Sequence, residues 1–418
     1  MSIIGIDLGT TFSKMAHLDS HGTPTSVPNR RGEHSTATCV YRAPDGGVLI
    51  GTDALEQAAV EPDRVARGFK LNLGSTAGVL AADPRYTATD AAADVLRHLR
   101  GCAADHTGED VTEAVVTVPA NSRDDAKQAL REAAEGAGLE ILRLLAEPTA
   151  AGFAYAMHKQ QDAVRSLVYD FGGGTFDVSV LQQEDGTLKV LATEGVQRLG
   201  GNDLSRCLET RVLADVEREC GSRPDPAADG MFFLDLWQKI ERAKASLARQ
   251  PEVPIVVAYR GHQVISRIRA RDFHADIQPL VEQSLQAMDR AVAAAGASYK
   301  QIDRLVLVGG TSRIPYIQER VAAHTGLVPR TDIDPEKAVA YGAALAAVAE
   351  LATQNRTATL RGRAIPAPNL FVRDVLAHDV GCCVVEPGKL DAVKALVNSR
   401  VVAKNTPIPC RVVHTYKL

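Results

Sequence analysis

Residues 168–177 read Val-Tyr-Asp-Phe-Gly-Gly-Gly-Thr-Phe-Asp: an apolar run, an acid, a glycine-rich turn and a second strand-like run. This pattern predicts a β-hairpin with a tip that can hold a phosphate. Glycine lets the backbone approach a phosphate, threonine adds a hydroxyl donor, and aspartate can hold a hydrated metal ion. Each glycine costs roughly 0.5–1 kcal/mol relative to alanine in regular structure. Three in a row therefore favour a close backbone approach over a flexible joint.

A near-repeat of this pattern opens the chain. Residues 3–11 read Ile-Ile-Gly-Ile-Asp-Leu-Gly-Thr-Thr, and residues 305–313 read Leu-Val-Leu-Val-Gly-Gly-Thr-Ser-Arg. Alone, residues 3–11 are weak evidence for a phosphate site, because Gly, Asp and Thr are also the residues that a tight hairpin needs at its tip. Two such hairpins that face each other would grip a polyphosphate from both sides. Together with the third segment, they favour nucleotide binding over coincidence.

These three segments resemble the motifs of the seventy-kilodalton heat-shock chaperone (DnaK-type) family, a branch of the actin-like and sugar-kinase-like ATPases. The resemblance implies an α/β fold of two actin-like lobes, duplicated units of β-sheet and helices, with a nucleotide cleft between them. It continues in family order to about residue 350 through residues 116–120 (Val-Thr-Val-Pro-Ala), 146–151 (Ala-Glu-Pro-Thr-Ala-Ala), 191–195 (Leu-Ala-Thr-Glu-Gly), 199–203 (Leu-Gly-Gly-Asn-Asp) and 334–343 (Asp-Pro-Glu-Lys-Ala-Val-Ala-Tyr-Gly-Ala).

The composition is that of an ordinary globular protein. The chain has 418 residues, enough for two or three domains, and is 45% hydrophobic and 23% charged. A net charge of −4 and the lack of a basic stripe argue against a nucleic-acid partner. Seven scattered cysteines without a Cys-x-x-Cys pair favour reduced thiols over disulfides or zinc. The chain opens directly into the first predicted strand, without a charged n-region and apolar signal core, and no run reaches the length of a membrane span. We therefore expect a cytoplasmic protein without a membrane partner.

The motifs divide the chain into three predicted parts. Residues 1–352 form the nucleotide-binding (ATPase) domain, with helical insertions at about 36–110 and 202–285. Residues 353–375 form an interdomain linker, and residues 376–418 form a short C-terminal fragment of the substrate-binding β-domain. Within the linker, Leu-Phe-Val-Arg-Asp-Val before the fragment resembles the apolar linker of the family, although an arginine breaks the usual aliphatic run.

Two local predictions concern elements next to the cleft. A strand over residues 113–120 is followed by a helix that Asn121 or Ser122 caps. Pro148 suits the first turn of another helix, which leaves Glu147 in the extended conformation that precedes proline. A carboxylate at this position would face the same cleft as the hairpins.

The resemblance implies ATP or ADP with Mg²⁺, and K⁺ as a second cation, at the phosphate end of the cleft. Lys70 would orient the attacking water and Glu147 would order the waters of the metal ion. An ordinary surface lysine stays the alternative for Lys70, because its surroundings match the family only as Phe-Lys-x-x-Leu-Gly. The remaining assignments are Asp7 and Asp170 on the waters of Mg²⁺, Asp177 on K⁺, and Thr10, Thr11, Thr175 and the backbone of Gly172, Gly173 and Gly174 on the phosphates.

At the nucleoside end, Glu241 and Lys244 share one face of a helix predicted over residues 237–247. Taken alone, the two form a solvated ion pair, and only the resemblance places them on the ribose. Arg313 would stack on adenine. Ala248 departs from the usual serine, which loosens the purine pocket by a hydrogen bond of about 1 kcal/mol. The other nucleotide-binding positions are Gly9, Gly200, Gly201, Gly309, Gly310 and Glu336.

Three functions are compatible with this fold, because fold alone does not set function. The first is an ATP-hydrolysing chaperone whose nucleotide state controls a C-terminal peptide-binding region, with a J-domain co-chaperone and a nucleotide exchange factor as implied partners. The second is a nucleotide-dependent switch or scaffold that acts through a partner protein. The third, a sugar or metabolite kinase, is disfavoured by the linker-like segment. Residues after Val375 supply only about two or three strands, so we do not expect tight capture of unfolded peptides.

Overall fold

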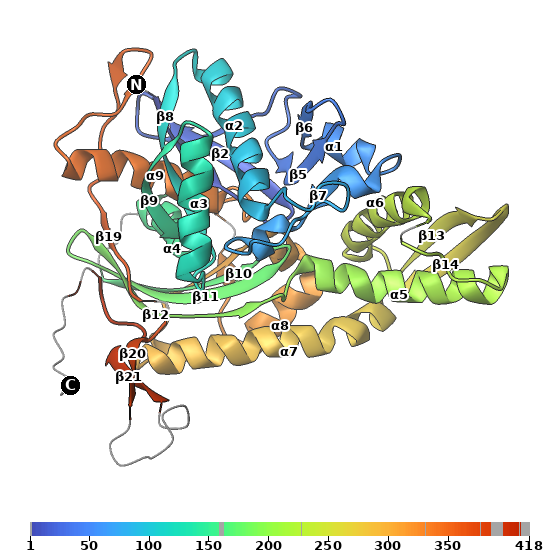
Figure 1. Ribbon diagram of the computed structural model, residues 1–418. Coiled ribbons are helices and arrows are strands. Elements are labelled where there is room, and N and C mark those ends of the chain that lie inside the picture. Colours follow the sequence, from blue (N-terminus) through green and yellow to red (C-terminus); the bar gives the residue numbers. More distant parts are fainter. Residues whose placement is uncertain are drawn as a thin grey trace.

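Two six-stranded sheets, each built around one of the predicted hairpins, form the centre of the protein (Figure 1). The computed structural model describes residues 2–410 apart from 159–162, 227, 331, 377, 386–395 and 409. The part of the predicted β-domain fragment that falls on 377, 386–395, 409 and 411–418 lies outside the described residues. None of the helices in the described part is both long and apolar enough to cross a lipid bilayer.

The two sheets have the same plan at their centres, with a hairpin beside a parallel strand. The first sheet has the order β3-β2-β1-β8-β9, with β4 also paired to β2, and the second has the order β16-β15-β10-β11-β12-β19. The strands of the first are β1 (Ser2–Asp7), β2 (Phe12–Leu18), β3 (Pro24–Val27), β4 (Thr36–Ala37), β8 (Val111–Val118) and β9 (Glu140–Ala146). Those of the second are β10 (Val164–Phe171), β11 (Thr175–Glu184), β12 (Thr187–Gln197), β15 (Arg304–Val308), β16 (Pro329–Arg330) and β19 (Phe371–Arg373).

The repeat in the sequence is therefore a repeat in the fold. β1 pairs antiparallel with β2 and parallel with β8, and β10 pairs antiparallel with β11 and parallel with β15. Both predicted hairpins are confirmed, as is the two-lobed α/β class. Asp7 is the last residue of β1, and Asp170 is the last but one of β10, so both acids lie beside the tips.

Helices cover both faces of each sheet, which is why the central strands are apolar on both sides. Ile3 and Val168 belong to the hydrophobic cluster between the sheets, whereas Ile4 and Tyr169 belong to the clusters on the outer faces. The middle layer consists of α4 (Glu147–His158) and α9 (Ala338–Thr353). The outer helices are α2 (Ala88–Thr107) and α3 (Asp124–Gly136) on the first sheet, and α5 (Gly201–Cys220), α6 (Gly230–Leu247), α7 (Ala270–Ala294) and α8 (Pro315–Thr325) beyond the second (Figure 1).

The middle layer is thin because its helices carry small residues where they cross. A Cβ atom on Gly342 of α9 would lie 1.7 Å from the carbonyl oxygen of Ala150 in α4. A Cβ atom on Gly5 of β1 would lie 2.1 Å from the backbone nitrogen of Ala344. Such contacts leave no room for a side chain. Backbone-to-backbone packing therefore sets the distance between the two sheets.

The two insertions are not purely helical, in contrast to the prediction. The first contains a three-stranded sheet, and the second contains the hairpin β13–β14, whose burial alternates along each strand. This alternation is a strand signal that the surrounding helical pattern obscured. The additional elements are β5 (Cys39–Arg42), β6 (Val48–Ile50), β7 (Val65–Arg67), α1 (Thr52–Gln57), two 3₁₀ turns η1 (Pro62–Arg64) and η2 (Phe69–Asn72), β13 (Glu252–Tyr259) and β14 (His262–Arg269).

Two local predictions beside the cleft were wrong. α3 begins at Asp124 after Arg123, and neither Asn121 nor Ser122 caps it, because a turn in which Ser122 N donates to Pro119 O precedes the helix. Glu147 is the first residue of α4 and not an extended residue ahead of it. Its carboxylate nevertheless lies at the cleft, at the N-terminal end of the helix.

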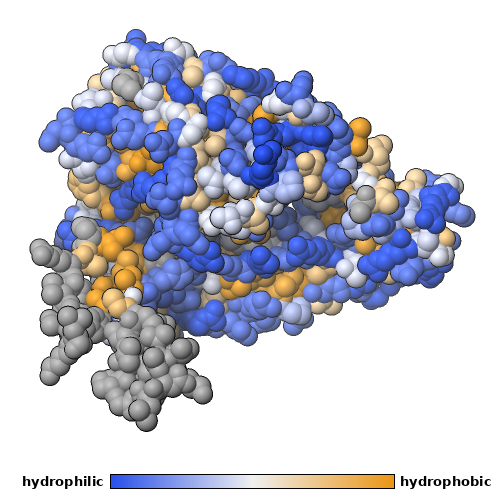
Figure 2. Space-filling view, viewed as in Figure 1, coloured by the Kyte–Doolittle hydropathy of each residue, from blue (hydrophilic) through white to orange (hydrophobic). Residues whose placement is uncertain are grey.

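The described C-terminal residues lie against the second sheet. β19 adds a parallel strand to the β12 edge, and Asn405 Oδ1 accepts a hydrogen bond of 3.2 Å from Thr193 N in β12. Lys404 Nζ pairs with Glu194 at 2.7 Å. Figure 2 shows a mostly hydrophilic surface, with hydrophobic colour gathered at the lower left near this segment. The two-stranded sheet β20 (Val380–Val385) and β21 (Leu396–Val402) follows, whereas the short hairpin β17 (Thr359–Leu360) and β18 (Arg363–Ala364) lies by the first sheet, where Arg361 donates to the backbone of Thr107 at the end of α2.

The tight crossing of α4 and α9 gives the first prediction. Gly342→Ala should lower the free energy of unfolding by about 1–3 kcal/mol, because the added methyl overlaps the backbone of Ala150. Gly136→Ala is the matched control, since a Cβ there would meet only a methyl group at 3.8 Å and should leave stability unchanged or slightly raised. Urea unfolding followed by circular dichroism measures both. Equal stabilities for the two variants would contradict the packing argument.

Candidate functional site

The tips of the two hairpins touch each other at the edge where β1 and β10 end. A Cβ atom on Gly173 would lie 2.3 Å from Thr11 Oγ1, and one on Gly174 would lie 2.7 Å from Thr10 Cγ2. A side chain at either position would displace the threonine side chain of the opposite tip. The contact of the tips therefore explains two of the three consecutive glycines, and the facing arrangement expected from the sequence is present.

A cavity of about 570 Å³ lies beside the tips, and most of the predicted site residues line it. Gly174 and Gly200 do not line it, because both are packed against the opposing backbone or side chains. Asp177 lines a second cavity instead. The predicted residues on the wall of the first cavity are Asp7, Gly9, Thr10, Thr11, Lys70, Glu147, Asp170, Gly172, Gly173, Thr175, Gly201, Glu241, Lys244, Gly309, Gly310, Arg313 and Glu336.

The hydrogen bonds of the tips leave the buried hydroxyl of Thr11 without a partner in the described part of the chain. Gly172 O accepts from Gly201 N at 3.0 Å and from Thr311 Oγ1 at 2.8 Å, which ties the second tip to the start of α5 and to the third glycine segment. Thr11 Oγ1 is buried and has no hydrogen-bond partner among the described residues. A buried hydroxyl without a partner costs free energy. An acceptor such as a phosphate oxygen would satisfy it, so the donor set fits a polyphosphate.

Acidic side chains and one buried lysine gather behind the tips. Asp170 and Asp177 stand opposite each other in the β10–β11 register, and Asp7 ends β1. Lys70, from η2, places its Nζ 2.5 Å from Glu147 Oε1. Only 8% of each of these two residues is exposed. Lys70 is therefore not the surface lysine that the sequence left open as an alternative.

Burial shifts the protonation of these acids. Burial raises the pKa of Glu147, although the Lys70 ammonium opposes the shift. The pKa of Asp170 is raised well above its ordinary value by burial and by the charges of Glu147, Asp177 and Asp7. Burial and the charge of Glu147 raise the pKa of Asp177 to about 8. The group lacks positive charge, so a bound cation would restore these acids to their ionised forms.

The spacing of the acidic side chains indicates how this site would hold a cation. No three His, Cys, Asp or Glu side chains in the described part of the chain lie close enough together to hold a metal ion directly. Mg²⁺ commonly keeps several water ligands and takes only one or two carboxylates. Asp7 and Asp170 suit that mode, since they flank the tips from the two sheets and can accept hydrogen bonds from such waters.

Glu241 and Lys244, predicted from the resemblance to lie on the ribose, form part of the wall of the cavity. Lys244 Nζ lies 2.8 Å from Glu241 Oε1 and donates to Ser205 Oγ at 2.7 Å. The Lys244 side chain is 13% exposed, so the pair is not freely solvated. Arg313 pairs with Glu336 at 2.7 Å on a more exposed part of the wall.

Several lining residues were not predicted from the sequence: Phe12, Lys14, Asn202 and Arg249. A signal for Lys14 existed, because in a hairpin with this tip it pairs directly with Asp7. No sequence signal marks Arg249, which follows the end of α6. Ala248, noted for its departure from serine, also lies on the wall.

A comparison with protein families agrees with this geometry. Residues 3–360 match the family model described as Hsp70 protein. The matched stretch contains both hairpins, the third glycine segment and every element from β1 to β17. It confirms the resemblance drawn from the motifs, and it ends before the strands that lie against β12.

The raised pKa of Asp177 gives a prediction about stability. Between the ordinary value of 3.8 and about 8, the folded protein holds a proton on this carboxyl that the unfolded chain has lost. In metal-free buffer, the free energy of unfolding should therefore be highest below pH 3.8 and should fall as the pH rises toward about 8. Asp177→Asn, which stays neutral, should show a smaller fall.

Thermal unfolding in EDTA between about pH 5 and about pH 8 measures this difference. The control is Asp185→Asn, since Asp185 is exposed and its left-handed turn (φ 48°) suits asparagine. The same fall in Tm for the wild type and for Asp177→Asn would contradict the assignment.

Proposed function

The chain belongs to the Hsp70 family, and on that premise we propose that it binds Mg-ATP in the cavity beside the hairpin tips and hydrolyses it slowly. Hsp70 proteins are ATPases and chaperones that bind nucleotide with a metal ion. The observation that carries the proposal is the pair of touching tips with the buried, unpaired hydroxyl of Thr11. Packing of the tips accounts for the glycines, but it does not account for a buried hydroxyl without a hydrogen-bond partner, which a phosphate oxygen would satisfy.

The proposed chemistry uses positioning and charge. Phosphoryl transfer to water needs aligned phosphates and an oriented nucleophile more than covalent help. Bound Mg²⁺ would neutralise phosphate charge. Thr10, Thr11 and Thr175 would hold the phosphates, and Lys70, fixed by Glu147, would orient the water.

Slow turnover follows from the same ion pair. One oxygen of Glu147 already accepts a hydrogen bond from Lys70, so that oxygen is not free to take a proton from water. Rate enhancement by a general base is worth about 10²–10⁴-fold, and the described site offers no well-placed histidine to supply it. ATP would then act as a timer, which suits a protein that changes state on hydrolysis.

We propose further that nucleotide state is coupled to the C-terminal segment through β12. Gly195 of this strand lies against the acid cluster, because a Cβ atom there would be 2.5 Å from Asp177 Oδ1. The neighbouring Thr193 and Glu194 hold Asn405 and Lys404. Hsp70 proteins generally work with J-domain proteins and nucleotide exchange factors, and we propose both as partners of this chain.

One observation favours the second function, a nucleotide-dependent switch that acts through a partner protein. The described residues after Val375 contain one two-stranded sheet, β20–β21, and they bind to the second sheet instead of forming a groove of their own. A switch would use this docked segment as its moving part. A measurement of peptide binding distinguishes the chaperone from the switch.

Isothermal titration tests the binding proposal, and one site for ATP with Mg²⁺ is expected. Thr11→Ala should weaken ATP binding by about 1 kcal/mol, roughly fivefold, because it removes a hydrogen-bond donor to the phosphates. The same variant should not lower Tm, since the hydroxyl has no protein partner to lose. Absence of both heat and thermal shift with millimolar nucleotide would refute the proposal.

Lys70→Ala should retain ATP binding and lose turnover, because the ammonium acts on water and on charge that develops during hydrolysis. Asp170→Ala should instead weaken the metal-dependent part of binding. Lys189→Ala is the control, since Lys189 forms an exposed ion pair with Glu184. Phosphate production under saturating ATP measures the effect, and normal hydrolysis by Lys70→Ala would show that its role is misassigned.

Fluorescence anisotropy with a labelled leucine-rich peptide, in ADP and in ATP, distinguishes the chaperone from the switch. We expect ATP turnover without tight peptide capture, because the two strands that the structure describes after Val375, β20 and β21, have unpaired edges and do not form a closed core. Micromolar binding that changes with the nucleotide would instead establish a working peptide-binding chaperone.

A further inference from the structure

A second cavity of about 380 Å³ lies on the other side of the phosphate clamp. It shares three lining residues, Thr10, Lys70 and Thr175, with the first cavity. The two cavities therefore adjoin at these three residues, and a group released beside Lys70 would lie next to both of them.

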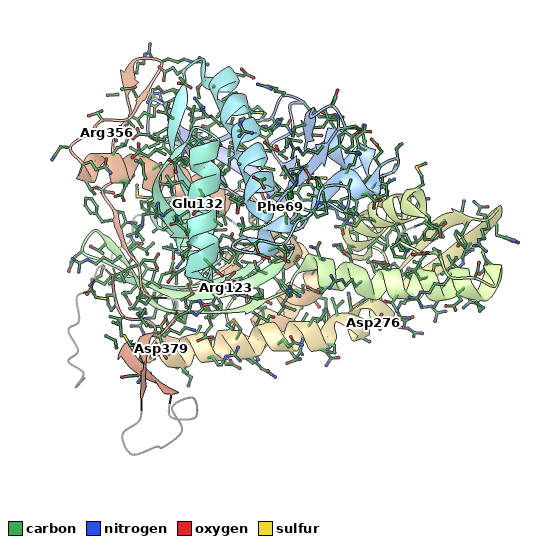
Figure 3. The ribbon with its side chains drawn as sticks, in the orientation of Figure 1. Phe69, Arg123, Glu132, Asp276, Arg356 and Asp379 are labelled. Carbon is green, nitrogen blue, oxygen red and sulfur yellow. The ribbon has the colours of Figure 1, made fainter. Side chains whose placement is uncertain are left out.

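Most of the charged residues that line the second cavity are basic. Arg123 and Arg198 are exposed and form its outer part, and Lys70 is buried at its inner part. Figure 3 shows Arg123 at the start of α3, on the side of the second sheet. Asp177 is the one acid among its lining residues. Arg123 is partly neutralised, because its Nε donates to Asp125 at 3.0 Å, whereas Arg198 forms no ion pair in the described part of the protein.

Two further features point to a ligand in this cavity. Arg198 has a left-handed backbone (φ 58°), a conformation that favours glycine or asparagine and costs a larger residue free energy. Asn121 Oδ1 is buried without a hydrogen-bond partner among the described residues. Strain and unsatisfied polar atoms of this kind collect at functional sites.

We propose that the second cavity is the exit route for inorganic phosphate, which binds transiently to Arg198 on leaving the clamp. The inference rests on the proposed function. ADP bound in the first cavity would block the path by which the cleaved phosphate could leave through the opening of that cavity. The second cavity offers a separate path, and its two arginines replace the attraction of Lys70 as the anion moves outward.

Two variants fill the route without touching the first cavity. Ala126→Phe adds a ring from the first turn of α3, and Ser122→Trp adds one from the preceding turn; both residues line the second cavity only. Glu135→Phe, at an exposed position of the same helix, is the matched control. Arg198→Gly removes the cation and suits the left-handed backbone.

The experiment compares ATP cleavage with phosphate release in a single turnover of the full chain. Acid quench measures cleavage, and a fluorescent phosphate sensor measures free phosphate. The two filling variants should cleave ATP at the wild-type rate but release phosphate roughly tenfold more slowly, so that a lag separates the two signals. Arg198→Gly should also delay release, and Glu135→Phe should behave as the wild type.

The two possible failures are distinguishable. Release that follows cleavage without a lag in both filling variants would overturn the exit route and leave the ATPase proposal intact. A wild-type chain that binds nucleotide but never cleaves it would overturn the proposed hydrolysis, and the exit route with it. If one filling variant lowers Tm strongly, the other one provides the test, because Ala126 lies in α3 and Ser122 lies in the turn that precedes it.

Discussion

The spacing between the two sheets is the constraint on which the rest of the structure depends. The hairpin tips can touch only if the middle layer of α4 and α9 is thin, and Gly342 and Gly5 provide the required backbone contacts. Helix packing usually keeps axes 8–10 Å apart, depending on the side chains at the contact, and alanine and glycine give the short end of this range. Two loops from opposite sheets thereby form one binding surface. A larger residue in the middle layer would separate the tips even though it lies far from them.

The same convergence creates the electrostatic character of the site. Each apolar strand ends in an acid at the tip, so bringing the tips together also brings Asp7, Asp170 and Asp177 near one another. Burial and the charge of Glu147 raise the pKa of both Asp170 and Asp177, and the charges of Asp177 and Asp7 raise that of Asp170 further. Lys70 offsets part of this charge through Glu147. A phosphate chain with its metal ion adds the charges that the site lacks, so ligand binding and the ionisation of the site are linked.

Much of the centre of the fold could be predicted because its signals are local. The apolar run, acid and glycine turn at residues 168–177 already specify a hairpin and a close approach. Lys70 was harder, since its partner Glu147 is 77 residues away and only the tertiary fold shows that the pair is buried. The hairpin β13–β14 was missed because helices surround it, and the predicted cap at Asn121 or Ser122 was wrong because a turn precedes α3. Arg249 reaches the cavity only through the position of α6, which no local pattern encodes.

The position of β12 links the acid cluster to the C-terminal segment in this fold. One end of the strand packs its Gly195 against Asp177, and the preceding residues bind the C-terminal segment by a backbone hydrogen bond and an ion pair. A strand in a covered sheet is stiff, because its neighbours fix its register. A change in the charge or position of Asp177 must therefore be absorbed by its side chain or passed along β12 to Thr193 and Glu194. Because an added Cβ atom on Gly195 would lie only 2.5 Å from Asp177 Oδ1, no side chain could stand between them, and a shift of this carboxylate toward β12 would meet the backbone of the strand directly.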